Sequence, residues 1–310
     1  MTDSHSSKAI LVTGGAGFIG SHTAVRLLER GDHVIVIDNL NDYYDPARKR
    51  ANLDEVRAST PNDASFQFIE GDIRDRALLD QIFSENRLDA VIHLAAMAGV
   101  RISVEDPWLY YDVNLTGTLN LLDCALRFGR PNFVFAATSS AYGRTEVVPF
   151  IETDSADRPL APYPASKRAA ELLGFSYHHL HGLDFTALRF FTVYGPRGRP
   201  DMMAYKVLDS ISKGTEVPLY NGGNMHRDWT FVSDIVSGIV AAADRRLGYE
   251  IINLGRGEPV LLKDFVDFIQ ELEGGKANLK DTPMMDADVA YTYADITKAR
   301  QLLEYDPQVS

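Results

Sequence analysis

Cysteine is nearly absent from this chain, and acidic side chains outnumber basic ones. Of the 310 residues only Cys124 is a cysteine, so no intramolecular disulfide can form, and the sequence fits a reducing compartment. Its surroundings, Leu121 to Leu126, are typical of a helix, which predicts a packing residue and not a nucleophile. The net charge of −12 disfavours nucleic acid and anionic membranes as partners, because both would repel the chain. An anionic substrate remains compatible with it, since local arginines can oppose the overall sign.

Long apolar runs are also missing, so no stretch is able to span a bilayer. Met1 to Ser7 is polar and lacks the basic end and apolar core of a signal peptide. We therefore expect a cytoplasmic protein with neither a membrane nor a nucleic acid as its partner. Hydrophobic residues make up 45% of the chain, enough to fill one large core or two domains.

A glycine-rich turn follows the first predicted strand. Ala9–Thr13 is apolar and rich in β-branched residues, and Gly14–Gly20 then opens a predicted helix over Phe18 to Arg30. Such a turn brings the backbone close to a pyrophosphate at the N-terminus of the helix. The second strand, His33 to Ile37, is followed by Asp38, whose carboxylate can accept hydrogen bonds from both ribose hydroxyls. A 2′-phosphate would face a negative charge there, so the pattern predicts NAD and not NADP.

Strands and helices alternate after this unit. Further strands are predicted at 66–69, 90–96, 133–137 and 185–191, and helices at 74–86, 107–128 and 165–181. Asn39 to Arg50 is polar and turn-rich, and Arg48, Lys49 and Arg50 are interpreted as a solvated face. The alternation predicts an α/β fold, a Rossmann-type parallel sheet with helices on both faces. The pattern changes near Gly195, which predicts an NAD-binding domain over 1–194, with some return of chain from about 229–250, and a smaller C-terminal substrate-binding domain over 195–310.

A tyrosine and a lysine stand four residues apart at the start of a predicted helix. Tyr163 and Lys167 share one face of that helix. A phenol with a pKa of about 10 is a poor base at neutral pH, but an adjacent cation favours the phenolate. Such a tyrosine can take a proton from a sugar hydroxyl while hydride leaves the same carbon. Thr138, followed by Ser139 and Ser140 at a strand end, can bond the same hydroxyl, so Tyr163, Lys167 and Thr138 are the predicted catalytic group.

These motifs together resemble those of extended short-chain dehydrogenase/reductases. The resemblance is carried by Thr13–Gly20, Gly71-Asp72-Ile73, His93-Leu94-Ala95-Ala96, Asn114-Leu115-Thr116-Gly117-Thr118, Ser139-Ser140-Ala141-Tyr142-Gly143 and Tyr163–Lys167. More narrowly, Ala96-Met97-Ala98-Gly99-Val100-Arg101, Arg189–Pro196 and Gly198–Met202 resemble the UDP-glucuronate 4-epimerases. The similarity covers essentially the whole chain.

The resemblance implies a site residue by residue. It implies NAD contacts at Gly14, Gly17, Phe18, Ile19, Asp38, Asn39, Asp72, Ile73, Leu94, Ala95, Ala96, Tyr163 and Lys167. It implies UDP-sugar contacts at Thr138, Ser139, Ser140, Tyr163, Thr192, Arg199, Tyr220, Arg227 and Asp288. Tyr163 matches the base, Lys167 the group that holds the nicotinamide ribose, and Arg227 an arginine that grips the UDP phosphates. Tyr220 matches a uracil-side aromatic and Asp288 a ribose-binding carboxylate. No metal is implied.

The family also implies a homodimer, through helices over 108–128 and 165–181 that carry apolar residues beyond one face. Three departures from the family pattern stand out. Pro164 follows the tyrosine where alanine is usual, which the start of a helix tolerates. Ala287 precedes Asp288 where glycine is usual, and relatives continue beyond Ser310 into one more helix.

Ser139 and Ser140 discriminate among the activities known on this fold. The 4,6-dehydratases carry an Asp-Glu pair there and decarboxylases usually a Glu at the second position, whereas serines have no pKa suited to that proton transfer. Thr192 stands where galactose-type epimerases carry asparagine. The resemblance therefore implies NAD-dependent C4 epimerisation of UDP-glucuronate to UDP-galacturonate through a transient 4-keto intermediate. The alternatives are a 4-epimerase of UDP-glucose or UDP-N-acetylglucosamine, a UDP-uronate decarboxylase, and a non-catalytic NAD-binding module.

Overall fold

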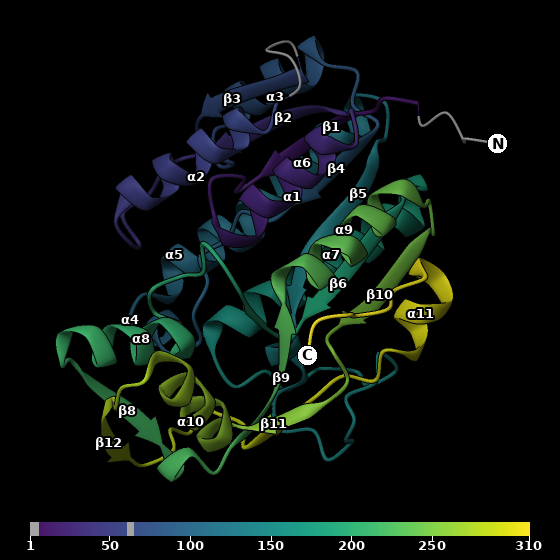
Figure 1. Cartoon of the computed structure of the whole chain (residues 1–310). Helices are drawn as coiled ribbons and strands as arrows, with labels where there is room; N and C mark the ends of the chain where they lie inside the picture. The colour runs from purple at the N-terminus through teal and green to yellow at the C-terminus, as the bar shows by residue number, and fades with distance from the viewer. Residues whose placement is uncertain (1–5, 61–64) are drawn as a thin grey trace.

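A computed structural model describes residues 6–60 and 65–310 (Figure 1), so the polar stretch Met1 to Ser7 lies largely outside the described residues. Its main body is a seven-stranded sheet in the order β10-β6-β5-β4-β1-β2-β3. All of its strand pairs are parallel. In chain order its strands are β1 (Ala9–Thr13), β2 (His33–Asp38), β3 (Phe66–Glu70), β4 (Ala90–His93), β5 (Asn132–Thr138), β6 (Phe185–Phe190) and β10 (Tyr249–Leu254).

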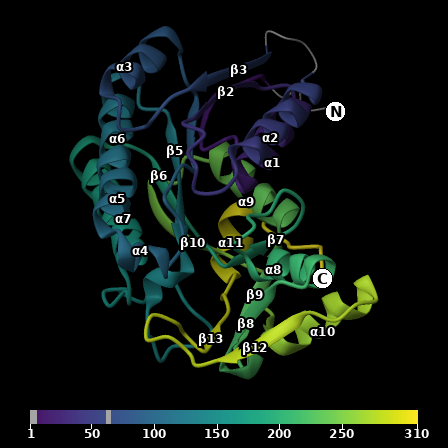
Figure 2. The same cartoon turned by 90° about the vertical axis from the view of Figure 1, so that its left-hand side faces the viewer.

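Helices cover both faces of this sheet, on opposite sides in Figure 2. Because the central strand β1 is apolar over 9–12, successive residues enter two cores: Ile10 and Val12 pack in one and Leu11 in the other. One face is covered by α1 (Phe18–Glu29), α2 (Pro46–Ala58), α9 (Val232–Asp244) and α11 (Thr297–Leu303). The other face is covered by α3 (Arg76–Glu85), α5 (Pro107–Tyr111), α6 (Gly117–Arg127) and α7 (Pro162–His181). The predicted Rossmann-type α/β fold is confirmed.

The helical stretch predicted over 107–128 is confirmed: α5 and α6 are joined without a break by a π-helical turn over Asp112–Thr116. One local prediction was wrong. The segment 39–50 is not wholly irregular, because α2 begins at Pro46, with Asp45 accepting a hydrogen bond from the backbone N–H of Ala47 at 2.9 Å. Proline in the first turn after an aspartate is a helix-start signal, and it explains this correction.

A smaller group of elements lies at the carboxyl end of the sheet, at the bottom of Figure 1. Its strands are β7 (Thr192–Tyr194), β8 (Glu216–Tyr220), β9 (His226–Phe231), β11 (Pro259–Leu261), β12 (Asn278–Thr282) and β13 (Tyr291–Thr292). Its helices are α8 (Met203–Lys213) and α10 (Leu262–Glu273), and the short α4 (Ile102–Glu105) lies beside α5 and α7. Trp229 and Val207 centre its own apolar core. Between these elements, α9 and β10 return to the large sheet.

The single cysteine packs in the core, as predicted. Cys124 is buried on α6, and burial together with a hydrogen bond to Asp80 raises the pKa of its thiol to about 12. A thiol of that pKa carries almost no thiolate at neutral pH, so Cys124 is not an activated nucleophile.

Candidate active site

The glycine turn lies where the strand order reverses between β1 and β4. Gly14 has a φ of +72°, and a Cβ there would lie 2.7 Å from the backbone N of Ala95. At Gly20 a Cβ would meet the backbone O of Gly14 at 2.2 Å. Helix α1 begins here with no side-chain cap and no acidic residue in its first turn. Its N–H groups are therefore open to an anion, and the cradle fits a pyrophosphate.

Two carboxylates follow neighbouring strands beside this turn. Asp38 is buried and accepts hydrogen bonds from the backbone N–H of Leu40 at 2.9 Å and of Ala16 at 3.2 Å. Burial raises its pKa, and nearby Lys49 and those two hydrogen bonds oppose the rise. Asp72 accepts from Asn39 at 2.9 Å, and hydrogen bonds from Arg74 lower its pKa to about 2. Asp38 thus stands where the sequence placed the ribose-binding carboxylate.

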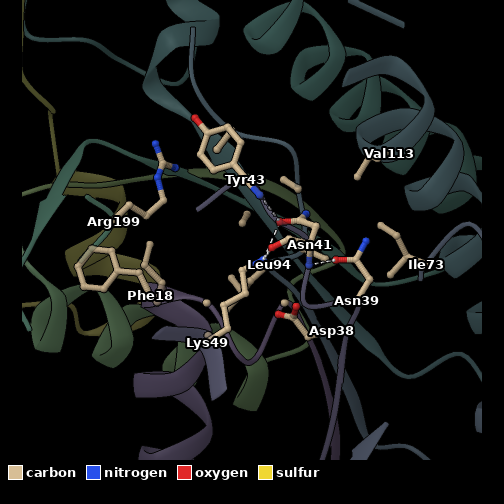
Figure 3. Close-up of a pocket in the computed structure, with 18 of the residues that line it drawn as sticks. Phe18, Asp38, Asn39, Asn41, Tyr43, Lys49, Ile73, Leu94, Val113 and Arg199 are labelled. Carbon is tan, nitrogen blue, oxygen red and sulfur yellow. Dashed lines mark hydrogen bonds between the residues drawn. The ribbon is translucent and has the colours of Figure 1, made fainter. Parts of the chain in front are cut away.

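Lys49 was wrongly interpreted as part of a solvated face. Its ammonium donates to the backbone O of Asn41 at 3.0 Å and to its Oδ1 at 2.6 Å, and it lies 5.1 Å from the ring centroid of Tyr44. The cause is the helical period of α2, which turns positions 49, 52, 53 and 56 inward together. Arg48 and Arg50 are exposed, as expected. Figure 3 shows Lys49 and Asp38 at the same cavity.

Every residue predicted to contact NAD lines this one cavity, from Gly14 on β1–α1 to Lys167 on α7. In Figure 3, Phe18 and Arg199 lie on one side of it and Asn39, Ile73 and Val113 on the other. The lining also includes residues that sequence reasoning did not select, namely Asn41, Tyr43, Tyr44 and Lys49. The contacts with NAD themselves stay predictions.

Two members of the predicted catalytic group, Tyr163 and Lys167, line this cavity, and the third, Thr138, is hydrogen-bonded to Tyr163. Tyr163 stands in the first turn of α7, and Thr138 ends β5, with its Oγ1 accepting from the backbone N–H of Ser140 at 3.2 Å. Burial raises the pKa of Tyr163, whereas Arg199 and a hydrogen bond with Thr138 lower it. Arg199 is thus a cation that favours the phenolate and that sequence reasoning did not select for this role, whereas the role of Lys167 stays a prediction. Burial outweighs the charge of Arg199, so the pKa of Tyr163 is raised in this structure.

Lys167 lies one turn further along α7 and is almost fully buried. Its ammonium lies 4.3 Å from the ring centroid of Phe135. Burial lowers its pKa to about 7, and the carboxylate of Glu171 opposes that shift. Glu171 is itself held by Arg189, at 2.9 and 2.7 Å, in a fully buried pair. Lys167 is therefore fixed in place by packing, beside a cluster of paired charges.

A second cavity adjoins the first and opens toward the smaller group of elements. Of the residues predicted to contact the UDP-sugar, Thr138, Ser139, Ser140, Tyr163, Thr192, Arg199, Arg227 and Asp288 all line it. Tyr163, Arg199, Tyr43 and Phe18 line both cavities. A ligand in the second cavity would therefore reach the tyrosine that a ligand in the first also contacts.

Tyr220 does not line this second cavity, and the guanidinium of Arg101, which does, lies 3.7 Å from its ring centroid. Arg101 also forms an ion pair with Asp288 at 2.8 Å. Arg227 lies nearby, and burial together with the charge of Arg101 lowers its pKa while Asp288 opposes that shift. Sequence reasoning missed Arg101 as a site residue. The signal was available in the Ala96–Arg101 motif, which ends on it.

Neither a metal centre nor a membrane span is found in the part of the chain that the structure describes. Its His, Cys, Asp and Glu side chains form no group of three or more suited to a metal ion. None of its helices combines the length and the apolar character that crossing a bilayer requires.

Comparison with known proteins shows which family and which solved structures this chain is similar to. The model of the NAD dependent epimerase/dehydratase family matches residues 10–255. A UDP-glucuronate 4-epimerase of Thermodesulfobacterium geofontis is 44% identical, over 97% of this chain and 91% of its own length. The structure of a UDP-glucuronic acid 4-epimerase from Bacillus cereus, in complex with UDP-glucuronic acid and NAD, is 33% identical with a TM-score of 0.89, over 97% and 95% of the two chains. A UDP-glucose 4-epimerase of Thermotoga maritima, solved with UDP-glucose, is also 33% identical, with a TM-score of 0.87 over 97% and 94% of the two chains.

Proposed function

This chain belongs to the NAD dependent epimerase/dehydratase family, and on that premise we propose that it is a UDP-glucuronate 4-epimerase. The observation that carries the proposal is the convergence of Tyr163, Thr138, Ser139 and Ser140 on a cavity that adjoins the dinucleotide cradle. The relatives named for this activity match almost the whole chain.

NAD would be held by the glycine turn, by Asp38 and by Lys167. The turn places backbone N–H groups against the pyrophosphate, Asp38 accepts from the adenosine ribose, and Lys167 donates to the nicotinamide ribose. Bound NAD supplies a hydride acceptor for C4 and returns the hydride to the opposite face. Because epimerisation is redox-neutral overall, this proposal requires no exchange of the cofactor between turnovers.

Tyr163 would act as general base and then as general acid at the C4 oxygen. Thr138 would orient that oxygen: its Oγ1 accepts from the backbone N–H of Ser140, and its hydroxyl, which bonds Tyr163 in this structure, would donate to the substrate oxygen instead. As C4 is oxidised, the proton of its hydroxyl passes to Tyr163, and it returns when C4 is reduced. The 4-keto sugar has to rotate between the two steps while Arg227 and Asp288 retain the UDP moiety.

The carboxylate of the substrate makes the 4-keto intermediate prone to decarboxylation while it rotates. A 4-keto uronate is a β-keto acid, which loses CO₂ when its carboxylate stands perpendicular to the carbonyl plane. Ser139, Ser140 and Thr192 line the same cavity and offer neutral hydroxyl donors on its walls. They would hold the carboxylate near the carbonyl plane in both orientations of the sugar, and no carboxylic acid stands at 139 or 140 to promote elimination.

The purified enzyme is expected to convert UDP-glucuronate to UDP-galacturonate with a kcat/KM at least about tenfold above that for UDP-glucose. The expected difference arises because the serine and threonine hydroxyls act on a group that UDP-glucose lacks. Product is measured by separating the two epimers, and absorbance at 340 nm should not grow with turnover. Equal or faster conversion of UDP-glucose would assign a neutral UDP-hexose epimerase, as in the Thermotoga maritima relative.

We propose that NAD and the UDP-sugar are bound mainly by two different regions of the chain. The large sheet with its helices, over 1–194 and the returning α9 and β10, would bind NAD, and the elements after 195 would mainly bind the UDP-sugar. This division rests on the positions of Arg227 and Asp288, which belong to the smaller group yet line a cavity that Tyr163 also lines.

We also propose that two copies of this chain form a homodimer through α5, α6 and α7. Trp108 is 85% exposed, and Leu172, Phe175 and Leu180 of α7 are 52%, 49% and 69% exposed. Helices α5 and α7 pack against each other, so these exposed side chains lie on neighbouring helices. A cluster of large apolar side chains of this kind is typical of an interface.

Sedimentation at micromolar concentration is expected to give about twice the 34.4 kDa of one chain. Trp108→Asp combined with Leu172→Asp should shift the protein to the monomer, because each places a charge in the interface. Leu272→Asp is the matched control, since Leu272 is likewise an exposed leucine, at 69%, but lies on α10. A monomer in the unmodified protein would contradict the pairing.

The cytoplasm is the compartment that we propose. The chain has one cysteine, and Cys124 is buried and not available for a bridge. Chains folded in oxidising compartments more commonly carry disulfides, so this composition favours a reducing one.

A further inference from the structure

Two residues after Arg199, the chain supplies a carboxylate that holds its guanidinium. Nε of Arg199 donates to Oδ1 of Asp201 at 2.9 Å, and Nη2 donates to Oδ2 at 2.8 Å. The hydroxyl of Tyr43 donates to the same Oδ2 at 3.4 Å. Both Arg199 and Asp201 line the second cavity, where the UDP-sugar would bind under the proposed function.

The loop that carries the pair is itself pinned. The hydroxyl of Tyr205 accepts from the backbone N–H of Gly198 at 2.9 Å and donates to the backbone O of Gly195 at 3.1 Å. A Cβ on Gly198 would lie 2.3 Å from the ring of Tyr205. Arg199 therefore approaches the cavity from a fixed backbone, and its direction is set by Asp201.

Asp201 is ionised at neutral pH in this arrangement. Burial would raise its pKa, but the hydrogen bonds and charge of Arg199 outweigh burial and lower it. The pair is thus close to electrically neutral. Arg199 retains its full positive charge, yet Asp201 already occupies the edge formed by Nε and Nη2, which is one of the two edges able to grip a carboxylate with two hydrogen bonds.

We propose that Asp201 is a positioning residue for the substrate carboxylate: it holds Arg199 by one edge and offsets its charge, so that Arg199 steadies the carboxylate without gripping it. This inference rests on the proposed function. A 4-keto uronate has to rotate between oxidation and reduction, and a carboxylate bound by an unopposed guanidinium would resist rotation. Asp201 therefore weakens the binding of the substrate and raises kcat. Both effects are expected only for a substrate that carries a carboxylate.

Asp201→Asn tests this directly, because asparagine keeps one acceptor for Arg199 but removes the charge. UDP-glucuronate is expected to bind about fivefold tighter by calorimetry, since a freed charge-assisted hydrogen bond strengthens the contact. Its kcat should fall about tenfold, because the ground state is stabilised more than the transition state for rotation. For UDP-glucose, both KM and kcat should change less than about twofold.

Two further variants distinguish an effect of the Asp201 charge from a general disturbance of the structure. Asp201→Glu keeps the charge and should restore most of the wild-type kcat with UDP-glucuronate. Asp209→Asn is the matched control, because Asp209 pairs with Lys213 at 2.9 Å on the exposed side of α8. It should leave both substrates unaffected.

Weaker binding of UDP-glucuronate by Asp201→Asn, or an equal change for the two sugars, would overturn the inference. The proposed function fails on a different result, namely a wild-type enzyme that does not epimerise UDP-glucuronate. The calorimetric comparison needs no turnover, so it decides the role of Asp201 in that case too.

Discussion

Tyr163→Phe is expected to lower turnover by about 10²-fold or more while leaving the binding of NAD and UDP-sugar nearly intact. The substitution removes one oxygen from a side chain at the meeting point of both cavities. Thr138 remains to orient the C4 hydroxyl, but no group is left to accept its proton. Burial raises the pKa of this phenol in the structure, so its phenolate depends on the positive charges around it.

The measurement is a pair of experiments on one preparation: kcat with UDP-glucuronate, and calorimetric titration with the same sugar. Tyr177→Phe is the matched control, because Tyr177 lies on the same helix, α7, and lines neither cavity. A Tyr163→Phe enzyme with wild-type turnover would show that another group is the base. Loss of binding in step with turnover would assign Tyr163 to binding instead.

Lys167→Met is expected to lower turnover to a similar degree, about 10²-fold, and to weaken retention of NAD. The ammonium is the group on α7 that would hold the nicotinamide ribose, and methionine fills its volume without a donor. Lys213→Met, on the exposed end of α8, is the matched control.

The same substitution should increase stability, and the size of the gain should depend on pH. The pKa of Lys167 is lowered to about 7 by burial, whereas an unfolded lysine titrates near 10.4. Below pH 7 both states carry the proton, and the folded protein bears the full cost of a buried charge. Between about pH 7 and 10 the folded state releases the proton first, so the wild type gains stability as pH rises.

The advantage of Lys167→Met in Tm, with both proteins saturated with NAD, should therefore be larger at pH 6 than at pH 9. Glu171 keeps its partners Arg168 and Arg189 in the variant, so no unpaired carboxylate is created. A Tm difference that is independent of pH, or that grows toward pH 9, would show that the pKa of Lys167 is not lowered in the folded protein.

Local patterns predicted the parts of the site that short segments build on their own. The glycine turn before α1, Asp38 at the end of β2, and the Tyr163–Lys167 pair each lie within one turn or one strand end. Their spacing fixes their geometry, because a helix or a strand has a set period. These residues lie in the cavities where the sequence placed them.

Contacts between distant segments were not predictable in this way. Arg101 and Asp288 are 187 positions apart, and nothing in either segment indicates the ion pair between them or the stacking of Arg101 on Tyr220. The burial of Lys49, in contrast, could have been predicted from the sequence. Recognising that α2 begins at Pro46 would have placed Lys49 on the buried face of that helix. The raised pKa of Tyr163 could not be predicted either, because it results from burial of the phenol, and that burial depends on packing across several elements.

Whether this enzyme prefers a uronate over a neutral sugar is decided by a competition between the two substrates. Equal concentrations of UDP-glucuronate and UDP-glucose are mixed with the enzyme, and the early appearance of each C4 epimer is followed by proton NMR. The ratio of the two rates equals the ratio of kcat/KM values, and a uronate epimerase is expected to give about ten or more, equivalent to about 1.4 kcal/mol of selective transition-state binding. A ratio of one or less would contradict the assignment of a uronate substrate.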